Sequence, residues 1–328
     1  MATYKGIKGV KVVTKTSDPT ASEAVGTVWY NSTSPTALKY AIQGAGAWAS
    51  GGNMNTARRY LAGAGISTAA LGYGGYTGGG APGYVRITES YNGTAWTEVA
   101  DLNSVRIQVY GAGTSTAALC AGGRGQPGSS AKAVTETWDG TSWTEVADLG
   151  TARYANVTAG TTTAAITAGG MDPSYTAVTE SWNGSAWTEV GDLNVAGSNF
   201  GGFGTSTAAF MCNGNPGPTT TVESWNGSSW AETTDTNTGR TDNGGASGVT
   251  TAALIYGGAP SFKADTESWS GSAWTEVANL STARRLAGSG TGTENTTAII
   301  FGGMTPPGTN VTEEWADPVI AIKTVTTS

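Results

Sequence analysis

Histidine is absent from this chain of 328 residues, cysteine occurs twice, and charged residues make up only 12% of the sequence. Without histidine, neither a Ser-His-Asp triad nor a Cys-His pair can form, and the commonest ligand of transition metals is missing. No stretch of about 18 apolar residues is present, and the first 25 residues lack an apolar signal segment. We therefore expect a protein that is not an enzyme, holds no metal or cofactor, and does not insert into a membrane.

What the chain does contain is a repeat of 44 to 48 residues, which recurs from about residue 56 to the C-terminus. Each copy has a run of small residues that ends at a glycine pair or its equivalent: Gly74-Gly75, Gly122-Gly123, Gly169-Gly170, Asn213-Gly214, Gly257-Gly258 and Gly302-Gly303. Five copies also have two aromatic residues five positions apart: Tyr91/Trp96, Trp138/Trp143, Trp182/Trp187, Trp225/Trp230 and Trp269/Trp274. Repeats of this length built from short strands are typical of β-propellers.

The residues inside each aromatic pair predict a tight hairpin. They read NGTA, DGTS, NGSA, NGSS and SGSA, and Asn-Gly or Asp-Gly favours the positive φ angles of such turns. Each copy then holds four short strands, expected in the second copy near 106–113, 117–122, 133–138 and 143–147. Cys120 and Cys212 fall on inner strands two blades apart, so we expect both to be buried and unpaired.

The last copy is incomplete, because Trp315 is followed by ADPVIAIKTVTTS, with neither a turn nor a second Trp. Residues 44–58 (GAGAWASGGNMNTAR) match the segment that follows the turn elsewhere. We therefore expect Trp48 on the outer strand of the final blade, so that the N-terminal strand closes the ring and leaves no exposed sheet edge. The prediction is an all-β, six-bladed β-propeller over 44–315, with its last blade completed by residues 44–55.

The pattern resembles the kelch family, in which a hydrophobic strand ends in Gly-Gly and an aromatic residue and a Trp follow. An arginine precedes the first strand of most copies, with Ser198 nearby in the fourth: Arg58, Arg106, Arg153, Arg240 and Arg284. A glutamate stands just before each turn aromatic: Glu89, Glu136, Glu180, Glu223, Glu267 and Glu313. Because a catalytic pair would break this repetition, we expect these arginines and glutamates to form structural ion pairs of the kelch-like scaffold.

Charge is distributed unevenly along the chain. The first 15 residues carry four lysines and no acidic residue, and since the whole chain is at −7, the remainder is at −11. A basic arm (1–27) on an acidic body suits docking to another protein, whereas the acidic body argues against nucleic acid. Segments 6–14 and 318–326 are strand-like, and we expect them to pair with each other or with neighbouring subunits, in a homo-oligomer or multi-copy assembly.

The segment between the arm and the repeats carries a second resemblance. Residues 28–43 predict a β-hairpin, and the series Gly-x-x-Trp-Tyr-Asn, Leu-Lys-Tyr, Gly-x-Trp after Ser-Asp-Pro is similar to a short module of bacteriophage tail and fibre proteins. This resemblance implies a virion protein that contacts other tail proteins through its arm and presents the propeller to a host-surface glycan or receptor. Residues 316–328 are expected to form a C-terminal strand or tail. Two alternatives are a virion decoration or connector protein without a receptor role, and a lectin-like module outside phages.

The loops after the glycine pairs differ in every copy, whereas the loop between the first two strands and the turn between the last two barely change. Variable loops on a rigid scaffold are where recognition usually lies. Aromatic side chains in these loops could stack on sugars, and arginine could bind their hydroxyl or acidic groups. The candidate contact residues are Tyr76, Tyr84, Arg124, Tyr175 and Phe262.

Overall fold

The computed structural model describes residues 12–19, 27–33, 37–43, 46–78, 83–126, 130–292, 295–316 and 320–325, and the regular secondary structure in these ranges is almost entirely β-strand. The chain divides into two compact units. The larger is Trp48–Ala316, and the smaller combines Met1–Ala47 with Asp317–Ser328. None of the helical segments in the described residues has the length and apolarity that crossing a bilayer requires.

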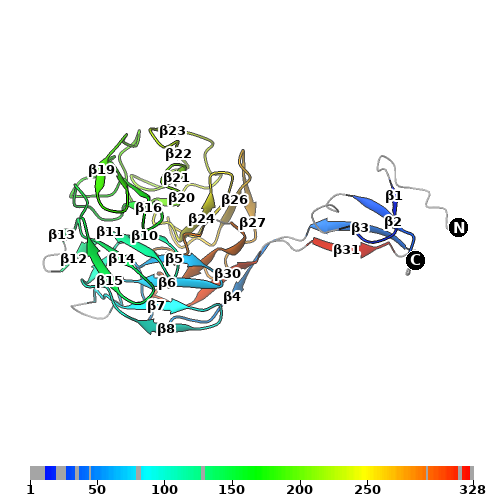
Figure 1. Ribbon diagram of the computed structural model, residues 1–328, viewed down its shortest axis with the longest axis horizontal. Helices are drawn as coiled ribbons and strands as arrows, with labels where there is room; N and C mark the ends of the chain where they lie inside the picture. The colour runs from blue at the N-terminus through cyan, green and yellow to red at the C-terminus, as the bar shows by residue number, and fades with distance from the viewer. Residues whose placement is uncertain are drawn as a thin grey trace. The chain divides into compact units, whose positions relative to one another are not determined.

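Six four-stranded sheets, numbered here as repeats 1 to 6, form the larger unit in a propeller-like arrangement (Figure 1). Repeat 1 comprises β5 (Ala62–Ile66), β6 (Ala69–Tyr73), β7 (Thr88–Tyr91) and β8 (Trp96–Val99). Repeat 2 comprises β10 (Tyr110–Gly113), β11 (Ala118–Ala121), β14 (Thr135–Trp138) and β15 (Trp143–Val146). Repeat 3 comprises β16 (Val157–Gly160), β17 (Ala165–Ala168), β18 (Thr179–Trp182) and β19 (Trp187–Glu189).

The remaining three sheets follow the same order of strands. Repeat 4 comprises β20 (Gly201–Gly204), β21 (Ala209–Cys212), β22 (Val222–Trp225) and β23 (Trp230–Glu232). Repeat 5 comprises β24 (Gly245–Val249), β25 (Ala252–Tyr256), β26 (Thr266–Trp269) and β27 (Trp274–Val277). Repeat 6 comprises β28 (Gly288–Ser289), β29 (Ile299–Phe301) and β30 (Thr312–Ala316), with β4 (Ala47–Ser50) as its fourth strand and the short 3-10 turn η1 (Asn295–Thr297) before β29.

Local sequence explains the hairpin at the outer edge of each sheet. In repeat 1, Tyr91 lies opposite Trp96, and Gly93 adopts a φ of 87°, which side chains other than glycine rarely adopt. Asn92 contributes through its side chain, since its Oδ1 accepts hydrogen bonds from the backbone N–H groups of Thr94 and Ala95. The glycine therefore supplies the left-handed backbone, and the asparagine closes the turn with its amide oxygen.

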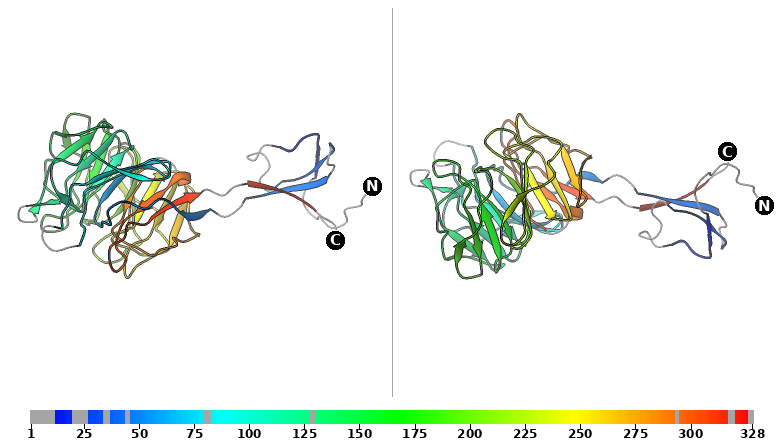
Figure 2. Two further views of the ribbon diagram at one scale, coloured as in Figure 1. Left: turned by 90° about the horizontal axis from the view of Figure 1, so that it is seen from below. Right: turned by 90° about the horizontal axis from the view of Figure 1, so that it is seen from above.

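The fourth strand of repeat 6 comes from the opposite end of the chain, and β4 lies beside β30 (Figure 2). Gly51 N–H donates to the carbonyl of Thr312 at 3.0 Å. The Trp48 and Trp315 rings are 5.5 Å apart in an edge-to-face contact. Residues more than 260 positions apart in the sequence thus share one sheet and one hydrophobic cluster.

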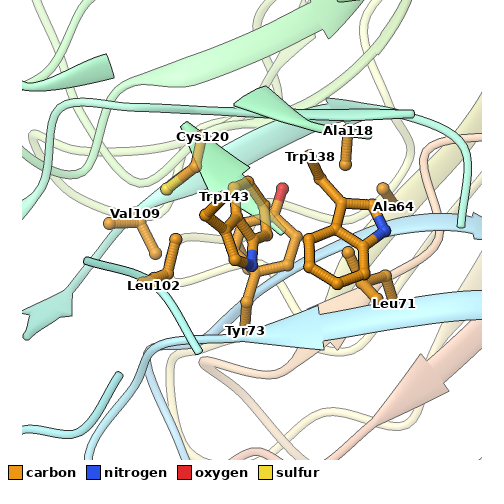
Figure 3. Packing of buried hydrophobic residues seen from close by; sticks show 10 residues of the cluster. Ala64, Leu71, Tyr73, Leu102, Val109, Ala118, Cys120, Trp138 and Trp143 are labelled. Carbon is orange, nitrogen blue, oxygen red and sulfur yellow. The ribbon is translucent and has the colours of Figure 1, made fainter. Parts of the chain in front are cut away.

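Neighbouring repeats pack through the tryptophan that begins each outer strand. Between repeats 1 and 2, Trp143 packs against Tyr73 with ring centroids 4.8 Å apart, beside Leu102 and Cys120 (Figure 3). The Trp143 indole N–H also donates to Thr88 Oγ1 at 3.1 Å, so the buried ring keeps a hydrogen-bond partner. Four more pairs repeat this bond between other repeats: Trp96–Thr312, Trp187–Thr135, Trp230–Thr179 and Trp48–Thr266.

The smaller unit is a sheet in the order β1-β2-β3-β31, made of β1 (Val13–Lys15), β2 (Val28–Asn31), β3 (Ala37–Gln43) and β31 (Ile320–Thr324). The expected hairpin at 28–43 is β2 paired antiparallel with β3. β31 runs antiparallel to β3 (Figure 1), and residues 6–11 of the expected N-terminal strand lie outside the described ones. β1 pairs in parallel with β2 at the other edge, so the hairpin separates the two terminal strands.

Asp18 connects the residues of the hairpin motif. Its carboxylate accepts hydrogen bonds from the Trp29 indole at 3.2 Å and from the Asn31 amide at 2.8 Å. The Lys39 ammonium lies 2.7 Å from the same carboxylate. These bonds, with the Lys39 contact the largest contribution, lower the pKa of Asp18. The Ser-Asp-Pro segment is therefore bonded to both strands of the hairpin through the Asp18 side chain.

Candidate functional site

A set of six residues, which we call the rim, precedes the first strands of the repeats, one residue in each. Each has a left-handed backbone although none is glycine: Tyr60, Gln108, Ala155, Asn199, Asp242 and Leu286, with φ between 46° and 57°. In repeat 2 this turn at Gln108 breaks the strand expected over 106–113 into β9 (Arg106–Ile107) and β10. β9 then joins β12 (Arg124–Gly125) and β13 (Ser130–Ala131), so the variable loop pairs with the segment leading to the rim.

Hydrogen bonds pass from each rim residue to the next. Gln108 N–H donates to Tyr60 O, Ala155 to Gln108, and Asn199 to Ala155, at 2.8–3.0 Å. An extra residue in repeat 5 changes the pattern, and the Asn243 side-chain amide donates to Asn199 O at 3.3 Å. Two further backbone bonds link Leu286 to Asp242 and Tyr60 to Leu286. Because unsupported left-handed residues cost free energy, these bonds explain why the strained turns persist.

Three arginines surround the rim, and each guanidinium lies over an aromatic ring. Arg59 lies 4.8 Å from the centre of the Tyr76 ring, Arg124 lies 4.7 Å from Tyr154, and Arg285 lies 5.5 Å from Phe262. Stacking of this kind holds each planar cation in a fixed orientation at the site.

Asp242 and Tyr60 complete the polar groups of the site. Arg285 lies 3.2 Å from the Asp242 carboxylate. Burial raises the pKa of Asp242, and Arg285 opposes that effect. The pKa of Tyr60 is also raised, first by burial and then by Asp242, while Arg59, Arg285 and Arg124 act in the opposite direction. These residues from different repeats are therefore close enough to influence one another's charge.

The structure brings four of the five candidate residues to this site. Tyr76 and Tyr84 form an edge-to-face pair with ring centres 5.9 Å apart. The Arg124 guanidinium reaches the Gln108 side-chain oxygen at 3.5 Å, and Phe262 lies under Arg285. Tyr175 is 39% exposed on the loop of repeat 3, where its backbone pairs with Met171.

Sequence reasoning missed Arg59, Tyr60, Tyr154, Asp242 and Arg285. All five lie one or two positions after the repeated arginine, in the connection between consecutive sheets. These two positions read RY, IQ, YA, SN, TD and RL in the six copies. This variation within an otherwise constant connection was a usable signal of a binding surface.

The cavities at the two ends of the first strands of the repeats differ in size and lining. Beneath the rim, a space of about 10 Å³ between Tyr60, Gln108 and Tyr110 has room for about one water molecule. At the other end, a cavity of about 250 Å³ is lined, among the described residues, by glycines, by small hydroxyl residues such as Thr114 and Thr161, and by Ile66 and Ala69. The described lining of the larger space is uncharged, whereas the rim offers charged and aromatic side chains.

The five repeated arginines belong to the scaffold. Each is fully buried and pairs with the glutamate of its own repeat: Arg58–Glu89, Arg106–Glu136, Arg153–Glu180, Arg240–Glu267 and Arg284–Glu313. The equivalent position in repeat 4 is Gly197 and not Ser198, because it stands two positions before the rim residue Asn199. Its backbone agrees, since Gly197 O accepts a hydrogen bond from Gly170 N–H in the same way that Arg153 O accepts one from Gly123 N–H. Ser198 instead aligns with Arg59, one position later in its own repeat.

Cys120 and Cys212 are free and fully buried. Burial raises the pKa of the Cys120 thiol to about 12. No group of three His, Cys, Asp or Glu side chains suited to a metal ion occurs within the ranges that the structure describes. The cysteines therefore serve as small apolar residues of the inner strands.

Comparison with known proteins supports the fold alone. No protein-family model matches the chain, and no curated protein matches it. Among solved structures, the one titled "Structure of YjhT" is similar with a TM-score of 0.64 at 14% sequence identity, over 83% of this chain and 99% of that one. At this identity the likeness extends to the all-β, multi-sheet architecture and not to function.

Proposed function

We propose that the larger unit is a closed, six-bladed, kelch-like propeller, and that the chain is a bacteriophage virion protein of the tail or fibre that presents the rim to a host-surface glycan. Closure is supported by the hydrogen bonds that run along the rim and return from Leu286 to Tyr60. It is also supported by β4 in repeat 6 and by the Trp96–Thr312 bond between repeats 1 and 6.

The observation that carries the binding role is the set of stacked arginines at the rim. Arg59, Arg124 and Arg285 are cations on a protein whose net charge is −7. Guanidinium groups bind carboxylate and phosphate in a bidentate manner, and the neighbouring aromatic rings suit the apolar faces of sugars. An acidic polysaccharide of a bacterial surface fits this combination better than a neutral sugar.

Attachment to the virion is assigned to the smaller unit, in keeping with the tail-protein motif that includes Trp29 and Asn31. Three of the five exposed large hydrophobic residues in the described chain lie there: Val12, Val13 and Ile322. Val13 and Ile322 are on β1 and β31, the two edge strands of the sheet. Edge strands with exposed apolar side chains suit pairing with strands of other subunits, including further copies of this chain.

Binding of the purified protein to acidic and neutral bacterial polysaccharides tests the rim directly. Replacing Arg59 or Arg285 by alanine should weaken binding to the acidic polysaccharide about tenfold or more, because each removes a charged contact of about 1.5–3 kcal/mol. Arg86→Ala is the matched control, since Arg86 is an exposed arginine whose side chain is 58% accessible and pairs with Asp101. Equal weakening by all three variants would contradict the proposal.

The exposed edges of the smaller unit also favour the alternative of a decoration or connector protein. Such a protein should bind virions but no polysaccharide. Deleting residues 1–20 should leave the larger unit folded and prevent incorporation into particles in either case. Normal incorporation of the deletion variant would contradict the assembly role proposed for residues 1–20. Polysaccharide binding without any virion association would favour a lectin-like module.

A further inference from the structure

Repeat 4 retains the binding site for a buried arginine but lacks the arginine. In repeat 1, Arg58 donates to the carbonyls of Gly74 and Ile87 at 2.8 and 2.6 Å, and to Glu89 at 2.9 Å. The equivalent acceptors in repeat 4 are the carbonyls of Asn213 and Thr221 and the carboxylate of Glu223, by the strand registers. Gly197 stands where the side chain would begin.

A cavity of about 40 Å³ lies at this place. Its lining includes Asn213, Thr221 and Glu223, together with Met211, which corresponds to the fourth residue of the arginine site, Gly72. This volume has room for about three water molecules, close to the four heavy atoms of a guanidinium group. The cavity therefore matches the missing group in position and size.

The chemistry of the cavity is that of an unfilled cation site. Glu223 is only 6% exposed, and no lysine or arginine of the described residues forms an ion pair with it. Its Oε2 accepts from the backbone and side-chain amides of Asn194, whereas Oε1, which faces arginine in the other repeats, accepts only from Val195 N–H. Asn213 is 3% exposed, and its Oδ1 has no hydrogen-bond partner within the described structure.

We propose that this cavity binds an alkylguanidinium cation, as in the side chain of an arginine from outside the chain. The exposed residues Val195, Ala196 and Pro216 line the cavity and provide apolar contact for an alkyl stem. A side chain at position 197 cannot easily fill the space, because its Cβ would lie 2.6 Å from the Phe200 ring and 2.3 Å from Asn215 O. None of the six rim residues lines this cavity, and the proposal does not depend on the proposed function.

Titration of the full chain with N-ethylguanidinium chloride tests this proposal. Calorimetry should show one site, and the same concentrations should raise the unfolding temperature, because ligands that bind only the folded state stabilise it. Tetramethylammonium chloride, a cation that cannot donate hydrogen bonds, should have neither effect. Equal responses to both salts would overturn the proposal.

Two variants locate the site. Glu223→Gln should weaken N-ethylguanidinium binding at least tenfold, and unchanged affinity would overturn the assignment. Arg240→Gly should create a second vacancy against Glu267, so that N-ethylguanidinium raises the unfolding temperature of this destabilised variant more than that of the parent. Absence of this rescue would also count against the proposal.

An arginine peptide distinguishes the source of the cation. A short peptide with arginine should compete with N-ethylguanidinium, whereas the same peptide with citrulline should not, because citrulline is uncharged. Competition would assign the cavity to a protein partner, and binding of the free cation without peptide competition would assign it to a small ligand.

Discussion

Replacing Arg106 by methionine should destabilise the larger unit by about 3–5 kcal/mol, the usual cost of leaving a buried charge without its partner. Arg106 is fully buried and donates to Gly122 O at 3.0 Å, to Val134 O at 2.7 Å and to Glu136 Oε1 at 2.5 Å. Methionine fills much of the same volume but leaves both carbonyls without that donor and the Glu136 carboxylate uncompensated.

The measurement is thermal and urea unfolding of the variant beside the parent protein. At about 2 °C per kcal/mol for a unit of this size, the unfolding temperature should fall by roughly 6–10 °C. The double variant Arg106→Met/Glu136→Gln should recover part of the loss, because the neutral amide still accepts hydrogen bonds from Asn103. A loss below about 1 kcal/mol, or a double variant no more stable than Arg106→Met, would refute the assignment of these pairs as buried structural ion pairs.

Three further outcomes follow from the same structure. Trp48→Phe should lower the free energy of unfolding by about 1 kcal/mol, because it removes the 3.0 Å hydrogen bond to Thr266. Trp143→Phe should have a similar effect through loss of the bond to Thr88, and unchanged stability of Trp48→Phe would argue against β4 as the fourth strand of repeat 6. Cys120 should react with a thiol reagent at pH 8 only as the protein unfolds, because its pKa is raised to about 12; rapid native labelling would contradict its burial. The pKa of Asp18 is lowered below its usual 3.8, so its stabilising effect is present above that pH and is lost as the pH falls through the folded value. Trp29 fluorescence should report this loss in the parent and not in Asp18→Asn.

The elements of each repeat were predictable because their signals are local. The strand before Gly74, the turn at Gly93 and the pairing of Tyr91 with Trp96 all depend on residues close in the sequence. The ion pair between Arg106 and Glu136 was equally accessible, since the same two residue types recur in five copies. The role of Asn92 differed in detail, because its side chain rather than its backbone conformation supports the turn.

The rim was only partly predictable. Tyr76, Arg124 and Phe262 were predicted from loop variation, whereas Asp242 and Arg285 come from the two variable positions after the repeated arginine, which the prediction did not use. Sequence spacing also left a one-residue ambiguity in the fourth copy, where it placed Ser198 only near the position of the arginine. Only the backbone hydrogen bonds showed that the position belongs to Gly197.

The amino-acid sequence by itself therefore determined an all-β chain of repeated four-stranded units, because strand alternation, turn glycines and recurring ion pairs act over short distances. Tertiary structure alone decided which side chains from different repeats meet at the rim, which strand β31 joins, and that repeat 4 contains a cavity lined by a buried carboxylate. These features depend on groups brought together across dozens to hundreds of residues, and their distances and burial exist only once the sheets have packed.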